Sequence, residues 1–295
     1  MAQERYINPY TDFGFKKLFG TEFNKDLLIS FLNALMEQSE HNSHDFIIDV
    51  EYLNAEHLGR TASERKAIFD VFCKTQNGGR FIVEMQNVFQ QFFKDRSIYY
   101  STFPIVEQIK KKETTFELQK IYTVGILNFV FRDDIDTRTS KHTTVEADSD
   151  DPLHHEVMLV DLKTNKVFFD KLVYIYLEMP KFKKTESELV TMYDKWLFVL
   201  KNLSKLFERP AALQERIFTK LFEQAEIAKF TPDEMQAYEE SVNAYRDIVN
   251  AVNDAEMKGV KNEKLATAKR MKAEGLDISL IAKITQLPPD EIEKL

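Results

Sequence analysis

Apolar residues recur at helical spacing near the N-terminus and at strand-like density in the segments that follow. In residues 24–38, apolar side chains fall three or four positions apart, which predicts an amphipathic helix with Asn24 as its N-cap. Three later segments are short and rich in β-branched and aromatic residues, as expected of strands: 46–53, 66–73 and 80–86. The TQNGG sequence between the last two is a turn signal, so these strands are expected to form a hairpin.

Helix and strand patterns alternate up to Pro180, and only helix patterns follow it. Residues 89–113 predict a long helix, with Pro104 as a kink or local break. The continuous apolar run 120–131 predicts a strand buried on both faces at the centre of the sheet, and the polar, acidic segment 132–152 predicts an exposed loop. Further strands are expected at 156–161 and 173–178, followed by helices over 186–207, 211–225, 232–260 and 262–294.

This order of elements predicts an α/β core with an all-helical C-terminal extension. The 295-residue length favours more than one structural part. We expect a core over residues 1–180, a helical region over 181–260 and a small basic tail over 261–295.

Composition narrows the class of protein. The chain is 43% hydrophobic and 30% charged, as in soluble folded proteins. Its single cysteine, Cys73, excludes an internal disulfide and a multi-cysteine zinc site, and lies in an apolar segment that predicts a core position. No apolar run approaches the ~20 residues that span a bilayer, and no signal-like start is present, so a cytoplasmic protein without a membrane partner is expected.

The net charge of −8 argues mildly against a nucleic-acid partner, since binding a polyanion depends on basic surface. A carboxylate active site is acidic by design, however, and a bound cation reverses the local sign.

Two acidic residues interrupt segments that otherwise belong in a core. Asp70 lies in the second predicted strand and Glu84 in the third, and a buried carboxylate must be paired, hydrogen-bonded, metal-bound or neutralised. Neighbouring strands joined by a short turn can bring both acids to one Mg²⁺ ion. Structural ion pairs are the alternative: Asp70 with Lys66 or Arg80, and Glu84 with Arg96.

Gln86, two positions after Glu84, is expected on the same strand face and therefore in the same site. Arg96 lies on the following helix, where it could reach a DNA phosphate or hold Glu84. Its neighbours Tyr99 and Tyr100 are interpreted as core or capping aromatics. The adjacent His154 and His155 point to opposite faces of a strand, which disfavours a zinc site.

Four blocks in one order carry a resemblance to a known family: INPYTDFGFKKLFG, KAIFDVFCKTQNGGRFIVEMQ, RSIYYSTF and LEMPKFKK. They resemble the recombination-promoting nuclease (Rpn) or transposase family of the PD-(D/E)XK nuclease superfamily, and the similarity covers essentially the whole chain. The resemblance implies a restriction-endonuclease-like mixed β-sheet core flanked by helices.

The resemblance also implies roles for particular residues. The first metal-binding acid falls on Asp70, and the acid of the E-x-K element falls on Glu84, but Gln86 stands at the lysine position. Gln cannot supply a positive charge or take a proton at neutral pH. Asp12 matches an extra acid on the first helix, with a helix N-cap as an equally weighted alternative.

The implied activity is that of a DNA endonuclease promoting recombination or mobile-element activity. Asp70, Glu84 and the Met85 carbonyl would hold Mg²⁺, or Mn²⁺, which lowers the pKa of a bound water. Gln86 would position that water, and Lys66 would contact a phosphate. Three rivals are a catalytically weak DNA-binding or regulatory protein, a strand-joining transposase and an enzyme acting on RNA; a homodimer is also left open.

The tail predicts two short amphipathic helices with a helix-turn-helix-like layout. Residues 257–283 hold seven Lys or Arg against three acidic residues, a net charge of +4. The basic charge favours DNA contact and target choice. The rival interpretation is that apolar residues pack on the body or on a second subunit: Leu265, Met271, Leu276, Ile278, Ile281, Ile284 and Leu287.

Overall fold

The computed structural model describes residues 4–39, 46–57, 67–109, 116–131 and 152–295. The chain divides into two compact units, Met1–Asn243 and Ala244–Leu295, which are described separately. The predicted α/β class is confirmed.

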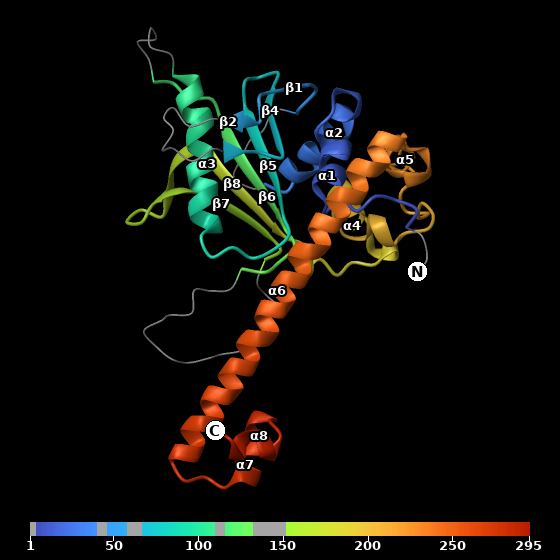
Figure 1. The fold of residues 1–295 in the computed structure, drawn as a ribbon. Coiled ribbons are helices and arrows are strands. Elements are labelled where there is room, and N and C mark those ends of the chain that lie inside the picture. Colours follow the sequence, from blue (N-terminus) through green and yellow to red (C-terminus); the bar gives the residue numbers. More distant parts are fainter. Residues whose placement is uncertain (1–3, 40–45, 58–66, 110–115, 132–151) are drawn as a thin grey trace. The chain divides into compact units, whose positions relative to one another are not determined.

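A mixed β-sheet lies at the centre of the first unit (Figure 1). Its strands are β1 (Val50–Tyr52), β4 (Val71–Thr75), β5 (Arg80–Gln86), β6 (Ile121–Leu127), β7 (His154–Asp161) and β8 (Lys166–Glu178), in the spatial order β1-β4-β5-β6-β8-β7. β5, β6 and β8 are parallel, while the other neighbouring pairs are antiparallel. β2 (Glu56–His57) and β3 (Ala67–Ile68) form a separate small ladder.

Helices cover the sheet on both sides (Figure 1). The α-helices of the first unit are α1 (Asp12–Phe19), α2 (Lys25–Met36), α3 (Phe93–Gln108), α4 (Met192–Asn202), α5 (Arg216–Ala225) and the start of α6 (Pro232–Ala273). Short 3-10 turns connect them: η1 (Glu22–Asn24), η2 (Met179–Lys181), η3 (Glu186–Glu188), η4 (Leu203–Lys205) and η5 (Ile227–Lys229).

Large aromatic side chains hold helices from distant parts of the chain together. Trp196 of α4 is fully buried, and its ring lies 5.7 Å from Phe19, 5.8 Å from Phe31 and 5.2 Å from Phe218. The indole N–H donates to Ser30 Oγ at 3.1 Å, which satisfies the one polar atom of the ring. Helices that the sequence places after residue 180 are therefore packed into the same core as α1 and α2.

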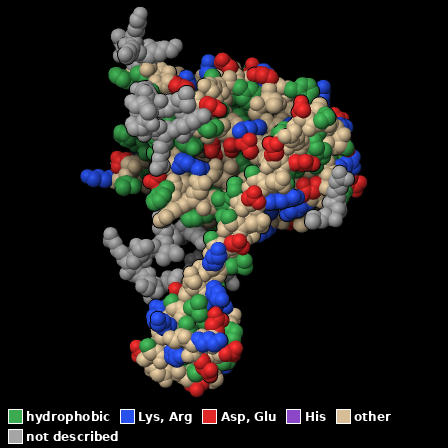
Figure 2. Space-filling view, in the orientation of Figure 1, with side chains coloured by type: hydrophobic (Ala, Val, Ile, Leu, Met, Phe, Trp, Pro, Cys, Tyr) green, Lys and Arg blue, Asp and Glu red, His purple; other side chains and the backbone are tan. Residues whose placement is uncertain are grey.

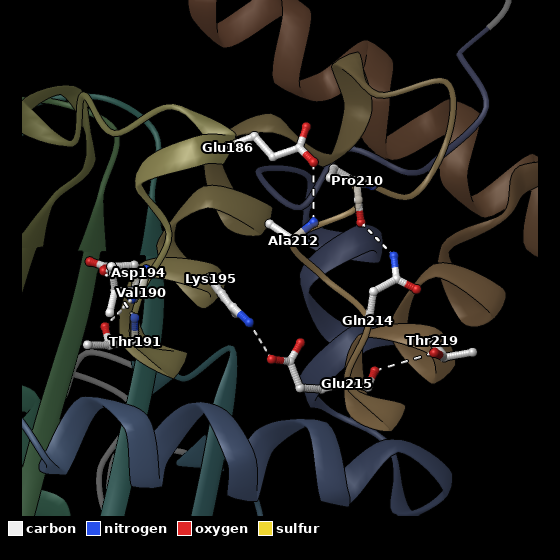
Figure 3. A network of polar contacts seen from close by, with 10 residues as sticks. All are labelled: Glu186, Val190, Thr191, Asp194, Lys195, Pro210, Ala212, Gln214, Glu215 and Thr219. Carbon is white, nitrogen blue, oxygen red and sulfur yellow. Dashed lines mark hydrogen bonds and ion pairs between the residues drawn. The ribbon is translucent and has the colours of Figure 1, made fainter.

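Polar contacts fix the loops around α4 and α5 (Figure 3). Thr191 and Asp194 form a capping box at the start of α4, which satisfies two backbone donors that the helix itself cannot. Lys195 of α4 forms an ion pair with Glu215, the residue before α5, and Glu186 accepts a hydrogen bond from the Ala212 backbone at 3.2 Å. These contacts fix the positions of α4 and α5, which contain none of the predicted site residues.

α3 packs on one face of the sheet, close to Gly125 of β6. A Cβ at Gly125 would lie 3.0 Å from Tyr176 Cδ1 and 3.2 Å from Phe93 Cζ, so a larger residue would crowd the ring on β8 and the first residue of α3. Hydroxyl pairs extend the contact, with Ser97 Oγ 2.7 Å from the Tyr176 hydroxyl and Ser101 Oγ 2.8 Å from the Tyr174 hydroxyl. α3 is thereby held over β5, β6 and β8.

The second unit has a small core of its own. The last turns of α6 pack with α7 (Ile278–Thr285) and α8 (Pro289–Glu293) around four buried residues: Ala268, Ile281, Leu287 and Ile292. Leu265, Met271 and Ile278 are partly buried against them, whereas Leu276 and Ile284 are exposed. The apolar residues of the tail thus pack mainly on one another. The face shown in Figure 2 has Lys and Arg side chains beside Asp and Glu side chains.

Several predicted elements have different bounds in the structure. The strand expected over 46–53 is confined to β1, and the helix expected over 89–113 is the shorter α3, which contains Pro104. The predicted break between 260 and 262 is wrong because α6 continues to Ala273. β5 and the central position of β6 are confirmed, as is the buried position of Cys73. The loop expected at 132–152 lies outside the described residues, apart from Pro152.

The strand predicted over 66–73 is interrupted at the residue of greatest interest. β3 ends at Ile68 and β4 begins at Val71, so Asp70 lies in the break and not in the middle of a strand. The Phe69 N–H donates to the Ala55 carbonyl at 3.0 Å, whereas the Asp70 N–H donates to the side chain of Glu84 at 3.2 Å. A carboxylate therefore satisfies the backbone donor at the break.

Within the described ranges, no helix is both long and apolar enough to cross a bilayer.

Candidate active site

Two acidic side chains face each other across the β4–β5 hairpin. The ladder pairs Val71 with Val83, so the next step of the register sets Asp70 opposite Glu84, with both side chains on one face. Glu84 in turn neighbours Gly125 on β6, which places the acids on the face that α3 covers. The predicted meeting of the two carboxylates occurs in the structure.

Each carboxylate is held by a backbone N–H of the other strand. Glu84 Oε1 accepts from the Asp70 N–H at 3.2 Å, and Asp70 Oδ2 accepts from the Met85 N–H at 2.8 Å. Because each bond joins a side chain to the opposite backbone, the separation of the acids is fixed by the register of the hairpin.

Burial makes the negative charge of this pair costly. Glu84 is 7% exposed, and burial, followed by the charge of Asp70, raises the pKa of Glu84 to about 8. Burial is also the largest cause of the raised pKa of Asp70, and the charge of Asp12 adds to it. The hydrogen bond from Met85 and the charges of Lys16 and Arg96 act in the opposite direction.

Neither acid is neutralised by an ion pair with a Lys or Arg of the described chain. The alternative pairings of Asp70 with Arg80 and of Glu84 with Arg96 are therefore wrong. Arg80 instead reaches the carbonyl of Gly78, and Arg96 donates to Gln90. Lys66, the remaining candidate partner and the predicted phosphate contact, lies outside the described residues.

Gln86 joins the pair as its position in the strand predicts. Its Nε2 donates to Glu84 Oε2 at 3.3 Å, so both oxygens of Glu84 accept a hydrogen bond. Where a lysine would add a positive charge, the amide orients the carboxylate without neutralising it.

The donor set fits a hard divalent cation. Asp70 Oδ1 accepts no hydrogen bond within the described chain, and Glu84 lies directly across the ladder from it. Two carboxylates suit Mg²⁺, which takes oxygen ligands and keeps several waters. A cation here would also offset the cost of burying the two charges, since burial is the largest cause of both raised pKa values. In the same ranges no cluster of three or more His, Cys, Asp or Glu side chains forms.

Asp12 lies at a pocket that reaches Asp70. Residues of α1 and of the first turns of α6 line this cavity of about 460 Å³ together with Asp70, among them Lys16. Asp12 forms an ion pair with Lys16 at 2.7 Å. The N-cap of α1 is Thr11, whose hydroxyl accepts from the Gly14 N–H at 3.0 Å, so the N-cap alternative for Asp12 is wrong.

Lys16 was not among the residues predicted for the site. It lines the same cavity as Asp70, and its positive charge lowers the pKa of that acid. The signal was present in the sequence, because Lys16 follows Asp12 by one helical turn in the FGFKKLF block.

Arg96 lies on the other side of the acid pair, on α3. Its Nη1 donates to Gln90 Oε1 at 2.5 Å, and its guanidinium carbon lies 5.4 Å from the Phe93 ring centre and 5.6 Å from that of Tyr100. Its Nη2 is buried and has no hydrogen-bond partner within the described chain. The charge of Arg96 lowers the pKa values of Asp70 and Glu84, which places it within electrostatic reach of both.

The two histidines separate as predicted. His154 Nδ1 lies 3.2 Å from the Tyr193 hydroxyl, while His155 Nε2 lies 3.1 Å from Glu178 Oε1. Glu178 is buried and also forms an ion pair with Lys181 at 2.7 Å. This third acid is therefore neutralised, unlike the pair at Asp70 and Glu84.

The structure thus brings two carboxylates together on an antiparallel hairpin of a mixed sheet. The family model described as PD-(D/E)XK nuclease family transposase matches residues 9–255. The chain therefore belongs to this family, as the sequence blocks predicted, and the family suggests a nuclease or transposase-like function with a divalent metal. Comparison with curated proteins and with solved structures gave no match.

Proposed function

We propose that this protein is a Mg²⁺-dependent DNA endonuclease that hydrolyses phosphodiester bonds. The observation that carries the proposal is the pair of acids, Asp70 and Glu84, set opposite each other and left without a cationic partner in the described chain. Burying such a pair is costly unless a cation compensates it in the working state.

Asp70 and Glu84 would bind the metal, with the Met85 carbonyl as a third ligand. When bound, Mg²⁺, or Mn²⁺ in its place, supplies an activated water and neutralises charge on the phosphate. Met85 lends the hairpin rigidity through its N–H, which holds Asp70 Oδ2 and leaves Oδ1 for the cation. Gln86 keeps the Glu84 carboxylate oriented through its amide.

Basic groups on either side of the acids would bind the DNA backbone. Arg96 offers a buried donor without a partner, and such a donor gains most from an anionic acceptor. Lys16 lies at the cavity that reaches Asp70, and Asp12, which forms an ion pair with it, would hold its ammonium group in place. Lys66 stays a proposed phosphate contact.

We further propose the wider organisation expected from the sequence. Residues 1–180 would form the nuclease core, 181–260 a helical region and 261–295 a basic tail that contacts DNA. The protein would act in the cytoplasm, in recombination or mobile-element activity. A homodimer would be recognised by its mass in solution.

The test is cleavage of supercoiled plasmid with Mg²⁺, Mn²⁺ or EDTA. Wild type should nick or linearise the plasmid only with metal, and Asp70→Ala should be inert. Glu51→Gln provides a matched control, because Glu51 is an exposed acid on the neighbouring strand β1 and should leave cleavage unchanged. If the protein shifts DNA on a gel but cleaves it under no metal condition, the nuclease proposal is overturned, and the protein is a DNA-binding protein with the same fold.

Strand joining is the second candidate, favoured by the transposase in the family description. A labelled donor end incubated with target plasmid distinguishes the two functions. Cleaved product alone supports hydrolysis, while covalent donor–target product supports transposition.

A further inference from the structure

A second pocket adjoins the acid pair on the side of α3. It encloses about 700 Å³ and is lined by the segment before α3 and by the exposed side of that helix, including Gln91, Phe92, Arg96, Tyr99 and Tyr100. The metal ligands proposed above do not line it. The pocket is thus a separate surface next to the cleavage site.

Two of the three aromatic side chains that line this pocket, Phe92 and Tyr99, are exposed. Phe92 is 68% exposed and contacts no other aromatic ring in the described ranges. Tyr99 is 39% exposed, although the sequence suggested a core or capping role for it. Its ring packs edge-on against Phe103 with centroids 5.2 Å apart. Exposed rings on an ordered helix and its entry segment are suited to stacking on a planar ligand.

Polar groups beside the rings select the kind of planar ligand. Arg96 supplies a fixed positive charge, with Nη1 occupied by Gln90 and Nη2 buried without a partner in the described chain. The Gln91 side chain is exposed and offers both a donor and an acceptor. Rings, an amide and a cation together match a nucleobase and its phosphate, because the base stacks, its edge pairs with amides and its phosphate takes the guanidinium.

The pocket lies close to the acid pair. Tyr100 lines the pocket, and its ring lies 5.2 Å from the ring of Phe69, the residue before Asp70. Arg96 also lines it, with its guanidinium carbon 5.6 Å from the centre of the Tyr100 ring. A phosphate near the acids and a base against Phe92 can therefore belong to neighbouring nucleotides.

We propose that this pocket holds an unstacked base of the strand being cut, so that the enzyme prefers single-stranded or locally unpaired DNA to continuous duplex. The proposal rests on the nuclease function above and specifies its substrate. Phe92 and Tyr99 supply the stacking surface, and Arg96 binds the adjoining phosphate. A base inside a paired duplex is stacked on its neighbours and pays an unpairing cost to enter, which gives the preference its physical origin.

The test uses oligonucleotides of one sequence in single-stranded, fully paired and single-bulge forms, each carrying one 2-aminopurine. Fluorescence is recorded in EDTA, where binding occurs without cleavage, and initial cleavage rates are recorded with Mg²⁺. Phe92→Ala removes the ring and Phe92→Trp keeps a stacking surface. Phe168→Ala is the matched control, because Phe168 is 78% exposed on β8 and does not line the pocket.

Wild type, Phe92→Trp and Phe168→Ala should quench 2-aminopurine in the single-stranded and bulged forms and cut these forms faster than duplex. Phe92→Ala should lose the quenching and weaken single-strand binding roughly tenfold. Equal melting temperatures for all variants exclude a folding defect. Metal-dependent cleavage at equal rates on all three forms, with no quenching, would overturn the base pocket and leave the nuclease intact. Quenching that depends on Phe92, without cleavage under any metal, supports the pocket and removes the nuclease function.

Discussion

Replacing Glu84 by Gln should stabilise the metal-free protein at pH 8. Glu84 is buried beside Asp70 with no cationic partner in the described chain, and its folded-state pKa is raised from 4.5 to about 8. An acid whose folded pKa exceeds its unfolded pKa costs no stability below pH 4.5. The folded protein loses stability as the pH rises from 4.5 toward 8, because over this range the carboxyl group ionises in the unfolded chain but not in the folded one. Gln has nearly the same shape and carries no charge.

The magnitude follows from the shift in pKa. Raising a pKa from 4.5 to about 8 costs on the order of 4 kcal/mol of unfolding free energy at pH 8, and less than about 1 kcal/mol at pH 5. Losing the charged acceptor for the Asp70 N–H offsets about 1 kcal/mol of the gain. The net gain of about 3 kcal/mol corresponds to a rise in melting temperature of roughly 6–12 °C at pH 8.

The assay is thermal melting of wild type and Glu84→Gln in EDTA at pH 5 and pH 8, repeated with Mg²⁺. Mg²⁺ should raise the melting temperature of wild type at pH 8 by mass action and affect the variant much less. Glu178→Gln is the matched control, since Glu178 is equally buried but pairs with Lys181 at 2.7 Å. Removing one member of a buried ion pair should lower the melting temperature at both pH values.

One result would refute this reasoning. If Glu84→Gln melts below wild type in EDTA by the same amount at pH 5 and pH 8, Glu84 is a satisfied structural group, and the argument for a cation site loses its energetic basis.

Three further outcomes test the packing and the titration of the core. Gly125→Ala should lower the unfolding free energy by about 1–3 kcal/mol, because its Cβ would lie 3.0 Å from the Tyr176 ring. In the control Gly259→Ala, the added Cβ would meet no heavy atom within 4 Å beyond its own helix. This change should be neutral or stabilising by up to about 1 kcal/mol, and both variants are measured by their urea midpoints. Burial lowers the pKa of His154, so its contribution is complete above pH 6.5 and is lost as the pH falls below that value; His154→Gln should flatten the decline between pH 7 and pH 5 in the same assay. Trp196→Ala should cost about 3–5 kcal/mol and abolish intrinsic tryptophan emission, and a folded variant with an unchanged midpoint would contradict its place in the core.

The chemistry of the site could be predicted because it violates local rules. Asp70 and Glu84 are charged residues in apolar strand sequences, and the period of two placed Gln86 beside Glu84. These signals lie within one hairpin whose turn is readable from the sequence, so no long-range contact was needed to bring the acids together.

The details that failed depend on hydrogen bonds and helix lengths that the spacing of apolar residues does not show. At the break before β4, the Glu84 side chain accepts from the Asp70 N–H, a bond that the pattern of residues 66–73 does not contain. The partner of Arg96 was missed as well, because Gln90, six residues earlier in the chain, accepts from its guanidinium. The break predicted near residue 260 is absent because α6 continues through Gly259 and ends only before Gly275, whose φ is +75°.

The reciprocal bonds between the acids and the opposite strand have an evolutionary consequence. Insertion or deletion of one residue in the turn, where Gly78 has φ of +84°, would slip the hairpin by one position and send one carboxylate to the other face. The two acids and the turn that joins their strands therefore form one heritable module, within which residues can be exchanged while the length is held constant.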